Sequence, residues 1–104
     1  MGTSVDRHSF NNDYYTRYDT LPGVKVDGHN VLAMRETMKW AKKYALKNGP
    51  IFVEADTYRY HGHSMSDPGL SYRSREEIMD ARRNLDCILK LKAMALDNKL
   101  VTKD

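Results

Sequence analysis

The sequence has little cysteine and no long apolar run, and both absences limit what the chain can be. Cys87 is the single cysteine among 104 residues, so no disulfide can form within the chain, which favours a reducing compartment. No apolar stretch approaches the roughly 20 residues of a membrane-spanning helix. The first residues hold no apolar signal core, and Asp6 stands where a myristoylation motif needs Ser or Thr. We therefore expect no membrane partner and no targeting segment within this chain.

A strong charge of one sign is also missing. The formal net charge is +3 with histidine neutral, and no run of five or six lysines and arginines occurs. Such a mild excess does not require nucleic acid, so we expect none as a partner. The length sets an upper limit of one domain, and 40% hydrophobic residues suffice for a modest core.

The first half of the chain has the pattern of a strand, a helix and a second strand. Residues 24–26 alternate apolar and polar side chains, and residues 51–55 form a short apolar run typical of a strand covered on both faces. Between them, Asn30 is placed to cap a helix that Gly49 ends. This order predicts a right-handed unit with two parallel strands. Because two strands are not a stable sheet, we predict an α/β fold that is part of a doubly wound parallel sheet.

The flanking segments differ from this unit. Residues 1–23 have no core pattern, although the tyrosines within them suit a short helical turn. Near the end of the chain, Ser74 and Glu77 form a capping box that opens a helix to about residue 85, and Asp86 is placed to cap another. Within the helix that follows Asn30, we expect one buried stripe: Val31, Met34, Met38, Ala41 and Ala45. We also expect Trp40 and the other methionines of the chain to belong to the core.

Residues 58–73 stand apart from every core pattern. This stretch, the 58–73 loop, contains two His, two Arg, three Tyr and three Ser around two Gly and one Pro. It begins where the second predicted strand ends, and ligands of open α/β sheets bind at the carboxyl ends of the strands. The composition and the position together predict a loop that faces a ligand.

The histidines of this loop do not suggest a metal site. His61 and His63 are two residues apart and would point in opposite directions in an extended loop, and the single cysteine is distant. We therefore assign no metal ligand. Two alternatives remain for these side chains. In the first they donate to a phosphate or shuttle protons, and in the second they are structural histidines hydrogen-bonded to backbone.

Two arginines bracket the loop and allow two interpretations. The planar guanidinium groups of Arg59 and Arg73 suit a phosphate or carboxylate ligand. Alternatively, they form ordering salt bridges with Asp67, Glu76 or Glu77.

The serines of the loop allow three roles, as nucleophiles, turn residues or phosphate acceptors. No Gly-x-Ser-x-Gly elbow surrounds them, which disfavours the nucleophile. Pro68 and Gly69 are placed for a type II turn. A phosphate on Ser64, Ser66 or Ser71 would add about −1.5 to −2 charges beside the histidines and arginines. That charge would reorder the loop or repel an anionic cofactor.

The loop closely resembles the phosphorylation loop of the alpha-subunit family of the pyruvate dehydrogenase E1 component. The family's motif for magnesium and diphosphate, Gly-Asp-Gly with a paired Asn, is absent here, and the family often has Pro where this chain has Cys87. Further stretches carry the resemblance: 2–7, 13–15, 21–23, 26–28, 35–36, 49–50 and 73–78.

The resemblance implies a mitochondrial-matrix enzyme that uses thiamine diphosphate and Mg²⁺. In this family an α2β2 heterotetramer oxidatively decarboxylates pyruvate and passes the acetyl group to the lipoyl domain of E2, which links glycolysis to acetyl-CoA. Its partners are the beta subunit, E2, and a regulatory kinase and phosphatase. Residues 1–104 are then a partial thiamine-diphosphate-binding domain with helices after the phosphorylation loop. The metal ligands would lie outside this chain. We expect these residues to be inactive by themselves.

The resemblance also assigns roles within the loop. His63 is the catalytic residue at the active-site mouth and, with Arg59, a cofactor-binding residue. Ser64, Ser71 and Ser4 are the kinase's acceptors, which makes the parent a phosphoprotein. Two alternatives stay open, a non-catalytic module that serves as kinase target or docking surface and an E1 alpha subunit for a related 2-oxo acid.

Overall fold

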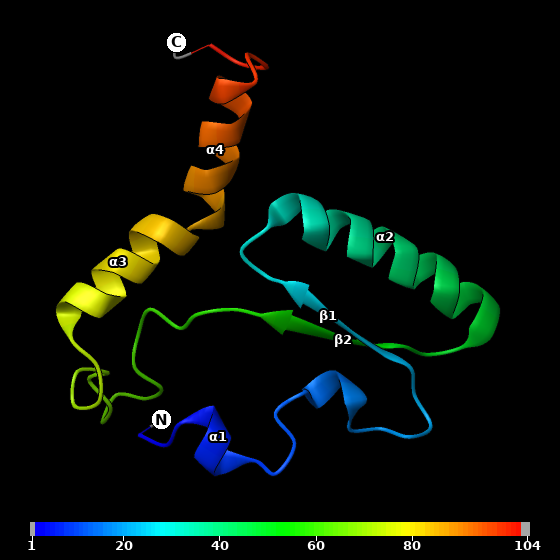
Figure 1. Cartoon of the computed structure of the whole chain (residues 1–104), viewed down its shortest axis with the longest axis horizontal. Coiled ribbons are helices and arrows are strands. Elements are labelled where there is room, and N and C mark those ends of the chain that lie inside the picture. Colours follow the sequence, from blue (N-terminus) through cyan, green and yellow to red (C-terminus); the bar gives the residue numbers. More distant parts are fainter. Residues whose placement is uncertain (1, 103–104) are drawn as a thin grey trace.

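The computed structural model describes residues 2–102, which form helices around one pair of strands (Figure 1). No helix in that range combines the length and the apolar character needed to cross a membrane. The elements follow the chain in this order: α1 (Val5–His8), the short 3-10 helix η1 (Tyr14–Thr16), β1 (Gly23–Asp27), α2 (Val31–Asn48), β2 (Phe52–Asp56), α3 (Arg75–Leu85) and α4 (Cys87–Asp97).

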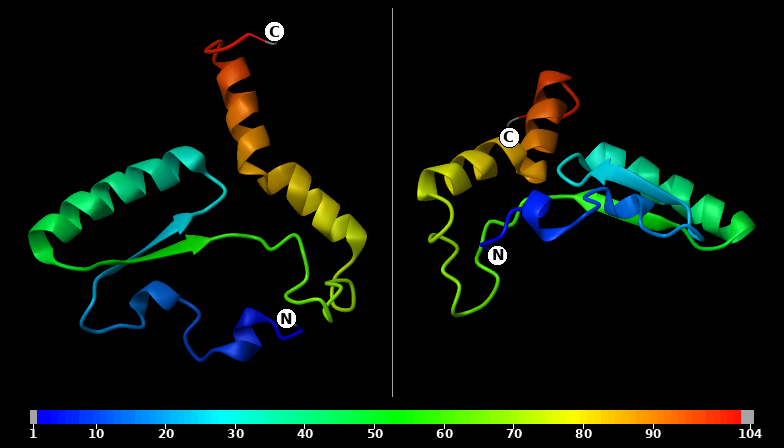
Figure 2. Two further views of the ribbon diagram at one scale, coloured as in Figure 1. Left: turned by 180° about the vertical axis from the view of Figure 1, so that it is seen from behind. Right: turned by 60° about the horizontal axis from the view of Figure 1, so that its bottom comes forward.

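β1 and β2 pair in parallel through α2, as the sequence predicts. Val24 lies opposite Val53, and Val26 lies opposite Ala55. α2 packs against β1, while η1 contacts both strands. The strand pair therefore lies between α2 and the N-terminal segment (Figures 1 and 2). The α/β class and the parallel pair are confirmed, and the larger doubly wound sheet stays a prediction.

The ends of α2 are set by local chemistry. The Asn30 side-chain oxygen accepts a hydrogen bond from the Ala33 amide at 3.0 Å, which satisfies one free donor of the first turn. Gly49 follows the helix with φ +100°, a value that favours glycine, and its amide donates to the Ala45 carbonyl. Both predicted caps are confirmed.

The starts of α3 and α4 are set in the same way. Ser74 Oγ accepts from the Glu77 amide at 3.1 Å. Asp86 Oδ1 accepts from the Ile88 and Leu89 amides at 2.9 and 3.1 Å. A carboxylate at a helix start also faces the positive end of the helix dipole. The predicted boundary between the two helices is therefore correct.

The N-terminal segment is attached to the sheet by polar contacts. The Tyr15 amide donates to Glu54 Oε2 at 2.7 Å, and the Glu54 carboxylate pairs with Lys25 Nζ at 3.7 Å. A Cβ at Gly23 would lie 1.8 Å from the Tyr15 carbonyl oxygen, so only glycine permits this approach. The predicted helical turn among the tyrosines is confirmed as η1, whereas sequence reasoning missed α1.

The predicted core is much larger than the observed one. Within residues 2–102, the buried apolar side chains are Val26 and Ala41 alone. Met38 and Trp40 were expected in the core, but they are 52% and 49% exposed. The expectation is wrong because no second layer packs on the outer side of α2. β2 is likewise half-buried rather than covered on both faces.

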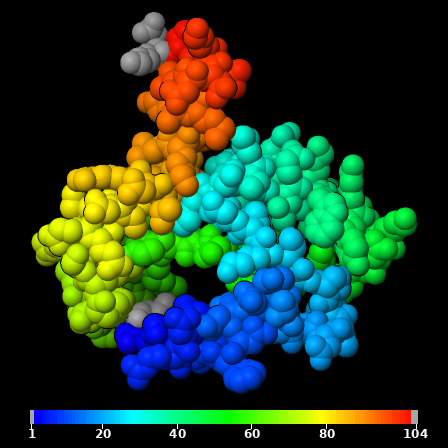
Figure 3. All heavy atoms as spheres, viewed as in Figure 1, coloured from blue at the N-terminus to red at the C-terminus, as the bar shows by residue number. Residues whose placement is uncertain are grey.

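The shape agrees with this small core. The radius of gyration is 17.3 Å, whereas a compact domain of about 100 residues has about 13 Å. α4 stands away from the strand pair in the space-filling view (Figure 3). The strand pair and α2 thus present a framework whose outer apolar faces are open.

Candidate functional site

The 58–73 loop leaves the carboxyl end of β2 and leads into α3, as predicted (Figure 1). It contains neither helix nor strand. Its backbone groups therefore need other partners, and two charged side chains supply partners for two amides and three carbonyls.

The first of these side chains is the carboxylate of Asp67. Its Oδ2 accepts from the His63 amide at 2.9 Å and from the Tyr72 hydroxyl at 3.0 Å, and its Oδ1 accepts from the Gly69 amide at 2.8 Å. The two backbone hydrogen bonds, from His63 and then Gly69, hold the pKa of Asp67 below its ordinary value, and Tyr72 adds to this. Partial desolvation, followed by the bond to Asp67, raises the pKa of Tyr72. Asp67 therefore acts as a charged centre for three donors.

The second side chain is the guanidinium of Arg73. Its Nε donates to the Gly69 carbonyl at 2.9 Å, its Nη2 to the His61 carbonyl at 3.1 Å, and its Nη1 to the Arg59 carbonyl. It also lies 5.3 Å from the centre of the Tyr58 ring. Arg73 thus joins the end of the loop to its beginning.

These contacts correct one interpretation of the arginines. Salt bridges from Arg59 or Arg73 to the carboxylates of Asp67, Glu76 or Glu77 do not occur in the described part of the chain. For Arg73 the physical reason is that three loop carbonyls already occupy its guanidinium donors.

Two glycines allow the loop to fold tightly on itself. Gly69 has φ +72° after Pro68, in agreement with the predicted type II turn. A Cβ at Gly62 would lie 1.8 Å from the Asp67 carbonyl oxygen, so a larger residue would force the two sides apart. The Asp67 amide also donates to the Ser64 carbonyl at 3.1 Å and closes a second turn.

The predicted cofactor-binding side chains take no part in the hydrogen bonds of this network. The side chains of His63 and Arg59 are exposed and make no hydrogen bond within residues 2–102. The structural alternative for His63, a ring bound to backbone, does not hold there, because only its amide is engaged. An imidazole and a guanidinium are suitable donors to an anionic diphosphate. By contrast, residues 2–102 bring together no three metal-ligand side chains.

The predicted phosphate acceptors are accessible. Ser64 and Ser71 are exposed on the loop, and Ser4 is exposed at the N-cap position of α1. Ser64 Oγ lies 3.0 Å from Ser66 Oγ, so the two hydroxyls share a hydrogen bond. Ser64 therefore stands within the turn that Asp67 holds.

Sequence reasoning missed an anchor at the first residue of the loop. The Tyr58 hydroxyl donates to Glu77 Oε1 at 3.1 Å, and the Tyr58 amide donates to His29 Nε2 at 3.0 Å. Sequence reasoning also treated Asp67 only as a turn residue or a salt-bridge partner. An Asp before Pro-Gly is a known signal for side-chain bonding to nearby amides, so the role of Asp67 was accessible. No local signal points to His29.

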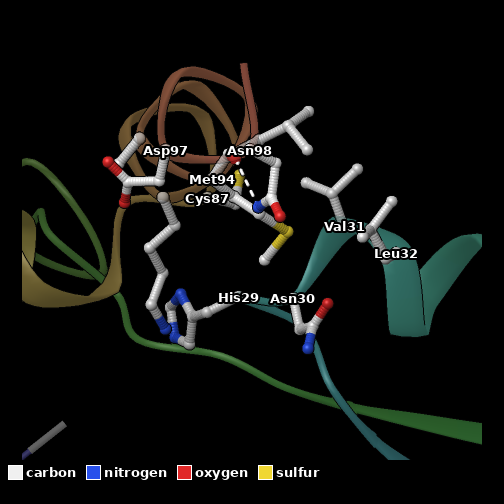
Figure 4. A pocket seen from close by; sticks show the side chains of 11 residues that line it. His29, Asn30, Val31, Leu32, Cys87, Met94, Asp97 and Asn98 are labelled. Atoms are coloured by element: carbon white, nitrogen blue, oxygen red, sulfur yellow. Dashed lines mark hydrogen bonds between the residues drawn. The ribbon is translucent and has the colours of Figure 1, made fainter. Parts of the chain in front are cut away.

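A separate apolar groove lies between the start of α2 and α4 (Figure 4). Val31 and Leu32 form one wall, and Cys87 and Met94 belong to the other. Cys87 is half-buried at this groove.

A parallel strand pair with a loop at its carboxyl end that exposes an imidazole and a guanidinium is an arrangement found in ligand-binding α/β domains. The chain belongs to the dehydrogenase E1 component family, whose model matches residues 1–104. This finding confirms that the chain as a whole belongs to the E1 family that its sequence resembles.

Among curated relatives, the probable mitochondrial pyruvate dehydrogenase E1 component subunit alpha of Caenorhabditis elegans is 50% identical over 105 residues, which cover 100% of this chain and 26% of the relative. The corresponding mitochondrial subunit of Sminthopsis macroura is 52% identical over 98% of this chain and 28% of its own length. That of Pisum sativum is 48% identical over 99% and 26%. The chain thus spans about a quarter of the length of these relatives.

Replacing Asp67 by Asn should loosen the loop. We would test this in a chimera in which residues 1–104 replace the matching 105 residues of the C. elegans relative, called the chimera below. An amide group offers one acceptor oxygen without charge, so the His63 and Gly69 amides should exchange several-fold faster with deuterium. Asp80→Asn, which affects an exposed pair with Arg83, is the control.

The same amides should respond to acid in the unsubstituted chimera. Because the pKa of Asp67 is lowered in the folded loop, its stabilisation is present above the ordinary value of 3.8 and is lost as pH falls through the lowered value. Protection of both amides should therefore persist from about pH 7 to about pH 4 and fall below that. Equal exchange in Asp67→Asn and the unsubstituted protein would contradict the role of Asp67.

Proposed function

We propose that this chain forms the loop-bearing part of the alpha subunit of a mitochondrial pyruvate dehydrogenase E1 component. The whole enzyme would oxidatively decarboxylate pyruvate with thiamine diphosphate and transfer the acetyl group to the lipoyl domain of E2. The observation that carries the proposal is the 58–73 loop, which follows the carboxyl end of β2 and leaves the side chains of His63 and Arg59 exposed. The names of the relatives support it.

Within that enzyme, the side chains of the loop have separate tasks. Arg59 places a permanent positive charge where the anionic end of the cofactor would lie. His63 donates a hydrogen bond to the same anion and holds or moves a proton at its imidazole nitrogen. Thiamine diphosphate, when bound, supplies the stabilisation of negative charge on carbon that decarboxylation needs. Its Mg²⁺ ligands would come from other parts of the alpha subunit.

The proposal also accounts for the open framework. Further strands would pair with the free edges of β1 and β2 and complete a doubly wound sheet around the cofactor. Ile88 and Leu46 are large side chains that are 73% and 81% exposed. They would then be covered within an assembly of two alpha and two beta subunits. We accordingly expect residues 1–104 alone to lack dehydrogenase activity.

Regulation would act on Ser64, with Ser71 and Ser4 as further acceptors for a kinase and a phosphatase. A phosphate on Ser64 brings about −1.5 to −2 charges into the turn that the Asp67 carboxylate holds. The Ser64 carbonyl accepts from the Asp67 amide, so the backbones of these two residues are in contact. Repulsion between phosphate and carboxylate would open the turn, and the same phosphate would compete with an anionic cofactor beside His63.

The enzyme assignment is tested with the chimera assembled with the C. elegans beta subunit. We expect decarboxylation of pyruvate that depends on thiamine diphosphate. His63→Ala should lower kcat by about 10²–10⁴-fold, the usual contribution of a general acid or base. His8→Gln, at an exposed histidine of α1, should leave activity unchanged.

Two results would contradict the assignment. Activity on branched-chain 2-oxo acids with none on pyruvate would indicate a related dehydrogenase. A folded assembly that accepts phosphate on Ser64 but binds no thiamine diphosphate would indicate a non-catalytic module.

Charge at Ser64 should weaken cofactor binding. We expect Ser64→Glu to raise the Kd of thiamine diphosphate by about tenfold or more, because one added charge faces both Asp67 and the cofactor. Ser64→Ala removes the hydroxyl without adding charge and is the matched control. Equal cofactor affinity for the two variants, measured by titration calorimetry, would contradict regulation by charge.

A further inference from the structure

His29 connects the turn between β1 and α2 to the first residue of the 58–73 loop. Its Nε2 accepts the amide hydrogen of Tyr58 at 3.0 Å across 29 residues of sequence. The His29 amide donates to Asp27 Oδ1 at 2.8 Å, which fixes the turn that carries the ring. The Gly28 amide donates to the Asp56 carbonyl at 2.7 Å and holds this turn against the end of β2.

This contact requires one protonation state of the imidazole. A ring nitrogen accepts an amide hydrogen only when it carries no proton, so the other nitrogen, Nδ1, must bear the hydrogen. Protonation would turn Nε2 into a donor that faces another donor. The hydrogen bond to Tyr58 therefore exists only while His29 is neutral.

Tyr58 transmits this contact to both ends of the loop. Its hydroxyl donates to Glu77 Oε1 on α3, and its ring lies under the guanidinium of Arg73 at 5.3 Å. Arg73 in turn binds carbonyls at the beginning and near the end of the loop. Loss of the amide contact would free the one residue at which these connections meet.

The surroundings of His29 contain charges of both signs. Figure 4 shows His29 opposite Asp97 and Cys87, which belong to α4. Titratable and charged groups of both signs line the two pockets that His29 also lines. They come from β1, β2, α4 and the start of the loop: Lys25, Asp27, Asp56, Tyr58, Cys87, Lys90 and Asp97.

We propose that His29 is a positioning residue for the 58–73 loop: the neutral ring tethers Tyr58, and its protonation releases the start of the loop. Because the tether requires the neutral ring, the order of the loop depends on pH. The proposal depends on the proposed function in one respect only: release of the loop would place His63 and Arg59 less well for an anionic cofactor.

The test uses the chimera assembled with the C. elegans beta subunit and follows deuterium exchange at the Tyr58 amide. In the unsubstituted assembly, the protection factor should fall several-fold as pH drops from about 8 to about 5. His29→Gln keeps an acceptor oxygen that does not titrate, so its protection should stay constant over that range. His29→Ala should be poorly protected throughout, and His8→Gln should behave as the unsubstituted protein.

Either of two results would overturn the proposal. One is the same pH dependence in His29→Gln as in the unsubstituted assembly. The other is constant protection of the Tyr58 amide in the unsubstituted assembly. Neither result depends on decarboxylation, so failure of the tether and failure of the enzyme assignment are distinguished.

Discussion

The carboxylate of Asp67 and its hydrogen bonds to backbone amides form the contact on which the candidate site depends. A loop without helix or strand leaves its amides and carbonyls to find other partners. Asp67 satisfies the amides of His63 and Gly69, while Arg73 satisfies carbonyls of Arg59, His61 and Gly69. One anion and one cation thus replace the ladder of a regular element.

This construction explains how the loop combines order with accessibility. Because its stability comes from polar contacts rather than from a buried core, the side chains of His63 and Ser64 remain exposed. The same feature makes the loop sensitive to charge. A phosphate on the loop, a protonated Asp67 or a protonated His29 would each remove or oppose a polar contact that no apolar packing replaces.

The sequence predicted those features that neighbouring residues determine. The caps at Asn30, Gly49, Ser74 and Asp86 depend on one side chain and the next few amides, and all four are confirmed. Burial depends on distant layers, so the predicted stripe is confirmed at Ala41, whereas Met38 and Trp40 are exposed.

In the site, too, the features set by neighbouring residues were predicted and those set by distant residues were not. Composition and position marked the 58–73 loop, but charge alone could not show that Arg73 binds carbonyls rather than carboxylates. The His29 contact spans 29 residues, and no local pattern indicates it.

The central claim is that the ionised Asp67 organises the loop. A carbon-detected NMR titration of the Asp67 carboxyl group in the chimera tests it most directly. The account predicts a pKa below the ordinary value of 3.8, with the His63 and Gly69 amide signals shifting in the same transition. A pKa at or above that value, or amide signals that do not follow the titration, would contradict it.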